Sequence, residues 1–188
     1  MDIFMLIIGL LAYIIGAIPT GYLIAQLKGI ADIRTHGSGN IGATNVSRLL
    51  GKHYFFLIFF LDAGKAFLFM YLIQPYVDFN YLCILASILL FGNGYSIFLQ
   101  GSGGKGVATL CGLLACLCPA ALIPLFIIWL FILFITNTVG IASVSAVACL
   151  PVYAYMTHNQ DFFLFSLFAT LWIIRTHRTN IKLYWNNR

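Results

Sequence analysis

The chain is 188 residues long; 62% of these residues are hydrophobic, only 8% are charged, and the formal net charge is +5. A water-soluble domain of this length needs far more polar surface, so the composition excludes that class and predicts an all-α, polytopic membrane protein. No polar linker interrupts the apolar runs, so we treat residues 1–188 as a single domain. We expect membrane lipids to surround it, and we expect no nucleic-acid partner.

About seven apolar segments follow one another, most of them near the length of about 20 residues that crosses a bilayer. They cover residues 3–27, 54–74, 80–99, 106–118, 120–136, 141–157 and 161–176. No basic residue precedes the first segment, which predicts a retained helix rather than a cleaved signal peptide. The segment 106–118 is too short to cross comfortably, so we expect a tilted or half-depth helix there.

The distribution of charge predicts the orientation of these segments. With seven crossings, the basic or polar stretches all lie on one side: 28–52, Lys105, 136–138 and 175–188. The opposite loops contain acidic residues and no Lys or Arg: Asp2, Asp78 and Asp161. The positive-inside rule then places the amino terminus outside and the carboxyl terminus in the cytoplasm. All polar motifs would face the cytoplasm.

The first polar motif is the glycine-rich segment 36–48. Its glycines let backbone N–H groups converge on an anion, and the amino end of a following helix adds partial positive charge. We expect a short helix from residue 42, with Thr44, Asn45 and Arg48 on one face, preceded by Ser38 and Asn40 as donors in the turn. The alternative is an ordinary loop in which Arg48 anchors to lipid headgroups, but the neighbouring donors favour an anion site.

The second motif is the segment 101–109, in which Lys105 follows Gly103 and Gly104. A Lys at the start of a helix is unfavourable for the helix dipole unless an anion is bound. Gly106 occupies the position where a Walker A loop requires Ser or Thr, so that motif is excluded. The alternative is an interfacial Lys whose stem lies in the membrane.

Further polar residues lie near the carboxyl end. Extension of the last helix would place His177 and Asn180 on one face and Arg178 and Lys182 on another; the alternative is a basic topology anchor. Ser143, at the start of the sixth segment, is placed to join the cluster, although a helix-packing serine is the simpler interpretation.

The small number of acidic residues argues against a metal site. The chain has no Glu, and its cysteines lie in apolar stretches without zinc-site spacing, so we expect no metal. Asp62 and Lys65 lie three residues apart within the second segment and are expected to form a structural ion pair, because either charge alone is costly there.

A family resemblance is carried by several motifs, in this order along the chain: 16–22, 32–34, 37–48, 61–65, 103–109, 142–143 and 177–181. The chain resembles the bacterial acyl-phosphate:glycerol-3-phosphate acyltransferase family over almost its whole length. The resemblance implies a seven-helix enzyme of phospholipid synthesis in the bacterial inner membrane. It would transfer a fatty acyl group from acyl phosphate to the 1-hydroxyl of sn-glycerol 3-phosphate, giving lysophosphatidic acid and inorganic phosphate without cofactor or metal. It also implies a functional link to the enzyme that makes acyl phosphate.

The resemblance also implies roles for individual residues. Three of them correspond to residues that hold phosphate: Ser38, Arg48 and Lys105. Three others correspond to residues around the glycerol phosphate: Ser143, His177 and Asn180. We expect a catalytic set of Ser38, Arg48, Lys105, His177 and Asn180, and a substrate-binding set of Asn40, Thr44, Asn45, Gly103, Gly104 and Ser143. The chain departs from the family's usual residues at Asn93, Ser96, Asn137 and Gly140.

The identity of the general base stays open between His177 and a phosphate oxygen of the substrate, with the phosphate slightly favoured. A covalent acyl-enzyme is not expected, because no Ser-His-Asp or Cys-His arrangement is visible. A metal-dependent phosphotransferase would need several intramembrane carboxylates, and Asp62 is the single one. The non-enzyme alternative is a transporter of a phosphorylated small molecule.

Overall fold

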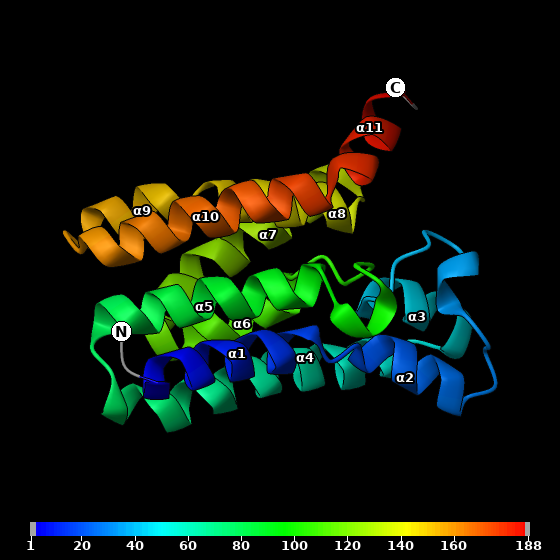
Figure 1. Ribbon diagram of the computed structural model, residues 1–188. Coiled ribbons are helices and arrows are strands. Elements are labelled where there is room, and N and C mark those ends of the chain that lie inside the picture. The colour runs from blue at the N-terminus through cyan, green and yellow to red at the C-terminus, as the bar shows by residue number, and fades with distance from the viewer. Residues whose placement is uncertain (1–2, 187–188) are drawn as a thin grey trace.

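The computed structural model describes residues 3–186; most of these residues are helical, and no strand occurs within that range (Figure 1). The α-helices are α1 (Ile3–Ala17), α2 (Thr20–Leu27), α3 (Ala43–Leu50), α4 (His53–Ile73), α5 (Phe79–Gly94), α6 (Val107–Leu117), α7 (Leu122–Thr136), α8 (Val139–Ala148), α9 (Leu150–Met156), α10 (Gln160–Thr176) and α11 (Arg178–Asn186). The short 3-10 turns are η1 (Ile33–Thr35), η2 (Gln74–Tyr76), η3 (Ile97–Leu99) and η4 (Pro119–Ala121). The all-α prediction is confirmed.

Four apolar helical stretches are long enough to cross a membrane: His53–Tyr76, Phe79–Leu99, Pro119–Thr136 and Val139–Met156. The pair α1 and α2, bent by 42°, is a fifth candidate. By contrast, α6 has 11 residues and α10 has 17. The shortness of the segment at 106–118 is therefore confirmed, whereas seven crossings stays a prediction.

The expected segments are broken more often than the sequence indicated. The stretch 3–27 is not one helix, because α1 ends before Pro19, which has no N–H to continue the helical hydrogen bonds. The stretch 141–157 is divided between α8 and α9, with Pro151 in the first turn of α9. The last helix does not continue unbroken past Thr176: α10 ends there, and α11 begins at Arg178 and runs in a different direction (Figure 1).

The start of α1 and the carboxyl-terminal helix α11 lie at opposite ends of the bundle (Figure 1), as an odd number of crossings requires. The end that carries α11 also carries α2, α3 and the loop between α5 and α6. Which end faces the cytoplasm stays a prediction; Asp2 and Arg188, which belong to the charge pattern, lie outside the described residues.

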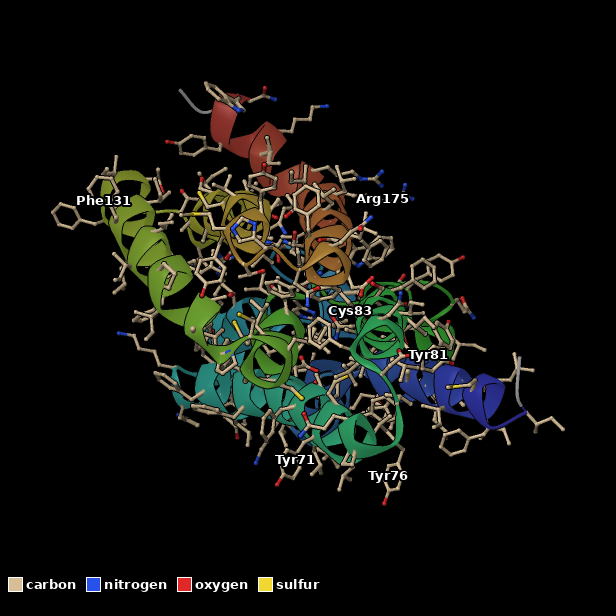
Figure 2. The ribbon with its side chains drawn as sticks, turned by 90° about the vertical axis from the view of Figure 1, so that its left-hand side faces the viewer. Tyr71, Tyr76, Tyr81, Cys83, Phe131 and Arg175 are labelled. Carbon is tan, nitrogen blue, oxygen red and sulfur yellow. The ribbon has the colours of Figure 1, made fainter. Side chains whose placement is uncertain are left out.

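The core lies around α5, and small residues bring other helices close to one another. A Cβ added to Gly16 of α1 would lie 2.1 Å from the carbonyl oxygen of Leu89 in α5, so these two backbones are in contact. Large apolar side chains point outward instead: Figure 2 shows Phe131 on α7 and Tyr71 on α4 directed away from the bundle, as a lipid-facing surface requires.

A second, smaller apolar cluster supports the end that carries the polar loops. It consists of buried side chains from α2, η1, the first loop, α3, α4 and η3: Ala25, Ile33, Ile41, Val46, Ile58 and Leu99. We call it the loop cluster. It anchors the first glycine-rich segment to the membrane helices.

Candidate active site

Asn45 organises the first glycine-rich loop. Its Oδ1 accepts a hydrogen bond from the backbone N–H of Ser38 at 2.9 Å, and its Nδ2 donates to the carbonyl oxygens of His36 and Asn40, both at 2.9 Å. The side chain is buried, with 2% exposure. Its side-chain amide thus bonds to three backbone groups of the loop, and the loop folds around this side chain.

The expected short helix after this loop is confirmed as α3. Thr44 lies in its first turn and is half-buried, whereas Arg48 in its last turn is exposed. Ser38 is exposed in the turn, where Gly37 and Gly39 adopt positive φ angles of 58° and 69°. The loop thus presents a hydroxyl and a guanidinium, while the buried Asn45 fixes its shape.

Asn93 at the end of α5 supports the second glycine-rich loop. Its carbonyl oxygen accepts the N–H of Gly104 at 2.8 Å, and a Cβ on Gly103 would lie 2.3 Å from the same oxygen. Only glycine fits so close to this backbone. The two loops also meet directly, because Asn40 donates from Nδ2 to the carbonyl oxygen of Gly103 at 3.3 Å.

Lys105 connects the second loop to the carboxyl-terminal helices. Its ammonium donates to Oδ1 of Asn180, and its carbonyl oxygen accepts the hydroxyl of Thr176 at 3.0 Å. Asn180 also packs on the start of α8, since a Cβ on Gly140 would lie 2.7 Å from its Nδ2. Asn180 therefore contacts both Lys105 and the start of α8.

The charge around Lys105 is not compensated by an acid. The two ion pairs found in residues 3–186 are Asp32 with Arg34 and Asp62 with Lys65, and neither involves Lys105. Burial lowers the pKa of Lys105 below its ordinary value, and the positive charge of Arg48 lowers it further. Two cations whose charges act on each other, neither of them in an ion pair within residues 3–186, form a site that favours an anion.

His177 lies at the junction between α10 and α11 and is 3% exposed. The geometry assigns a proton to Nδ1, which donates to the carbonyl oxygen of Ile173 at 2.9 Å and leaves Nε2 as the acceptor. Burial lowers the pKa of His177 to about 4, and the charge of Lys105 acts in the same direction against the bond to Ile173. The imidazole is therefore neutral at physiological pH.

Ser143 is used within the helices. Its hydroxyl donates to the carbonyl oxygen of Val139 at 2.9 Å and accepts the indole N–H of Trp129 from α7 at 3.1 Å. This is the contact expected of a helix-packing serine. A bond donated to a substrate would require the hydroxyl proton to turn away from Val139.

The structure therefore connects the first loop, the second loop and α11 through Asn40, Gly103, Lys105 and Asn180. Sequence reasoning missed Asn93 and Thr176 as supports of the second loop.

No group of three or more residues suited to a metal occurs in the described part of the chain. An apolar cavity of about 240 Å³ lies near this end, lined by Ile18, Pro19, Tyr22, Leu23, Phe98 and Leu99.

The comparisons with known proteins all point to one family of enzymes. A family model described as glycerol-3-phosphate acyltransferase matches residues 6–187. The glycerol-3-phosphate acyltransferases of Desulforudis audaxviator and Thermosipho melanesiensis are 40% and 37% identical over 178 and 172 residues. These alignments cover 94% and 92% of this chain, and 89% and 84% of the two relatives.

Two crystal structures of PlsY (YgiH), an integral membrane glycerol 3-phosphate acyltransferase, have the same fold. The glycerol 3-phosphate form matches with a TM-score of 0.92 and 33% identity, and the lysophosphatidic acid form with a TM-score of 0.90 and 32% identity. Each match covers 98% of this chain and 93% of the other chain.

Proposed function

This chain belongs to the glycerol-3-phosphate acyltransferase family, and from that premise we propose that it uses acyl phosphate as the acyl donor. The protein acylates glycerol 3-phosphate to give lysophosphatidic acid. The two PlsY structures are the forms with this substrate and this product. The observation that carries the choice of donor is the pair of cations Arg48 and Lys105 beside two glycine-rich loops, neither of which forms an ion pair with an acid in the part of the chain that the structure describes. Two phosphorylated reactants supply the missing negative charge.

We assign the leaving phosphate to Ser38, Arg48, Lys105 and the N–H groups of the loops. The 1-hydroxyl oxygen of glycerol 3-phosphate attacks the carbonyl carbon of the acyl phosphate, and the bond between this carbon and the phosphate oxygen breaks. The phosphate leaves with the bonding electron pair, so negative charge grows where the cations lie. Donors placed there in advance stabilise the transition state more than the bound substrate.

Glycerol 3-phosphate is assigned to Asn180, His177 and Ser143, with Asn40, Thr44, Asn45, Gly103 and Gly104 shaping the surrounding loops. Holding the two reactants side by side supplies much of the rate acceleration. The low pKa of His177 makes its imidazole a weak base. A phosphate dianion, with a second pKa of about 6, is the stronger acceptor, which supports a substrate oxygen as the group that takes the hydroxyl proton.

We place the reaction at the cytoplasmic face of the bacterial inner membrane, where the enzyme that makes acyl phosphate would deliver the donor. Positive charge at this end of the bundle supports the orientation. The test uses purified protein with acyl phosphate and glycerol 3-phosphate in chelator. We expect lysophosphatidic acid and phosphate in equal amounts, and no product with acyl-CoA. Product from acyl-CoA alone would refute the proposed donor.

A further inference from the structure

The bend between α1 and α2 leaves a backbone group without its helical partner. In an unbroken helix the N–H of Thr20 would reach the carbonyl oxygen of Gly16. Here it bonds to the carbonyl oxygen of Ile18 instead, at 3.1 Å. Pro19 between them has no N–H to offer. The carbonyl of Gly16 therefore needs another donor, and within a membrane that donor must come from the protein.

Lys65 of α4 supplies this donor. Its Nζ lies 3.2 Å from the carbonyl oxygen of Gly16, 2.7 Å from that of Ile18 and 2.7 Å from Oδ1 of Asp62. An ammonium has three N–H bonds, so these three acceptors satisfy it completely. The same Asp62 oxygen accepts the hydroxyl of Thr20 at 2.6 Å. Lys65 is thus bonded to residues before Pro19, and Asp62 to Thr20 after it.

The bend leads directly to the first glycine-rich loop. Gly21, in the first turn of α2, packs on the backbone of Ile41 in that loop, where an added Cβ would lie 2.0 Å from the carbonyl oxygen. Ile41 and Ile58 of α4 both belong to the loop cluster. A change in the direction of α2 would therefore move the backbone between Asn40 and Gly42.

The same turn of α4 also contacts the helix that follows the second loop. Gly112 of α6 packs on Ala63, next to Asp62, and a Cβ on Gly112 would lie 2.0 Å from the carbonyl oxygen of Ala63. Because α6 begins two residues after Lys105, the turn that holds the bend also fixes the helix that presents this lysine. One turn of α4 is thus shared by the supports of both loops.

We propose that Thr20, Asp62 and Lys65 are positioning residues for acyl transfer, which lock the bend at Pro19 and thereby hold the first glycine-rich loop in register with Lys105. This inference rests on the proposed function. It differs from the simpler view of an ion pair that merely neutralises two buried charges. If neutralisation were the whole role, a neutral pair of similar size would serve equally well.

The main test is the double variant Asp62→Asn with Lys65→Met. It carries no buried charge, but it leaves the carbonyls at the bend without the ammonium. Lys52→Met, at an exposed position just before α4, is the matched control. We expect hydrogen exchange in residues 18–42 to become faster in the double variant, while exchange in α5 stays unchanged. We also expect kcat to fall by about tenfold or more, with little change in the KM for glycerol 3-phosphate.

A second pair of variants makes a smaller change. Thr20→Val keeps the shape of the side chain but removes its hydroxyl, and Thr20→Ser keeps the hydroxyl. We expect Thr20→Val to lower kcat and to speed exchange in residues 18–42, and Thr20→Ser to resemble the unaltered protein. This pair decides the question if the double variant does not fold in detergent.

Unaltered kcat and exchange in the folded double variant would overturn the inference, and so would identical behaviour of the two Thr20 variants. The proposed function is tested separately by the unaltered protein. If that protein transfers no acyl group, the proposed function fails, and the exchange measurements still show whether the bend positions the loop.

Discussion

Lys105 donates a hydrogen bond from its ammonium to Oδ1 of Asn180, although the two residues are 75 positions apart in the chain. This bond joins the second glycine-rich loop to α11. The first loop reaches the same place through Asn40 and Gly103. Three segments that are distant in sequence are therefore joined through the second glycine-rich loop.

Replacement of Lys105 by Ala should abolish most acyl transfer without unfolding the protein. The ammonium is the half-buried cation that we place next to the developing phosphate charge, and loss of one such donor typically lowers kcat by about 10²- to 10³-fold. Steady-state kinetics would measure the loss, with Lys52→Ala as the control. Turnover within a few-fold of that of the unaltered protein would remove Lys105 from the mechanism.

Two substitutions at Asn180 separate its effect on Lys105 from simple packing. Asn180→Ala removes the acceptor, whereas Asn180→Asp keeps the shape but places a carboxylate beside the ammonium. An acid there pairs with Lys105 and repels phosphate. We expect the Asp variant to raise the KM for glycerol 3-phosphate more than the Ala variant does. The opposite order would show that Asn180 does not face the phosphate.

His177 predicts a specific pH dependence of stability. Its pKa is about 4 in the folded protein and about 6.5 when unfolded, so the unfolded state binds the extra proton between these values. Stability should therefore fall as the pH drops from about 6.5 to 4, by about 3 kcal/mol at most, since one pKa unit corresponds to about 1.4 kcal/mol.

Thermal melts of the protein and of His177→Gln across this range would measure the effect. The Gln variant lacks the titrating group, so its melting temperature should decline less toward low pH. Parallel curves for the two proteins would contradict the assignment of a buried, neutral imidazole. If Gln also preserves substantial activity, a substrate oxygen rather than His177 takes the proton.

Asn45 should be intolerant of an isosteric change. Asn45→Asp keeps the acceptor for the N–H of Ser38 but turns a carboxylate oxygen toward the carbonyls of His36 and Asn40. We expect a loss of about 1–3 kcal/mol from the free energy of unfolding. Hydrogen exchange should rise within residues 36–42. Exchange as slow as in the unaltered protein would show that Asn45 does not hold the loop.

The sequence predicted the features that depend on local pattern. Apolar runs gave the helical class, and the spacing of Asp62 and Lys65 predicted the ion pair that the structure confirms at 2.7 Å. The short helix after the first loop was also expected. Each of these depends on residues near one another in the chain, so periodicity and spacing contain the information.

Features that depend on how loops and helices fold back on one another were not predicted. The sequence places Asn45 on a helix face with Arg48, but its neighbours in space make its amide a support for the loop. Ser143 was expected near the substrate, yet its hydroxyl is bonded to Trp129 and Val139. Pro19 could have indicated the bend, because Pro within an apolar helix interrupts its hydrogen bonds.

Family membership also decides between the function classes that the sequence left open. A transporter of phosphorylated molecules is the alternative that the basic loops alone permitted. The match over residues 6–187 and the two PlsY structures favour the enzyme.

The most direct test of the site is a structure of this protein with glycerol 3-phosphate and a non-hydrolysable acyl phosphonate bound together. We predict that both anionic groups lie within hydrogen-bonding distance of the cluster formed by Arg48, Lys105 and Asn180, with the glycerol 1-hydroxyl next to the acyl carbon. Either anion bound away from this cluster would contradict the account.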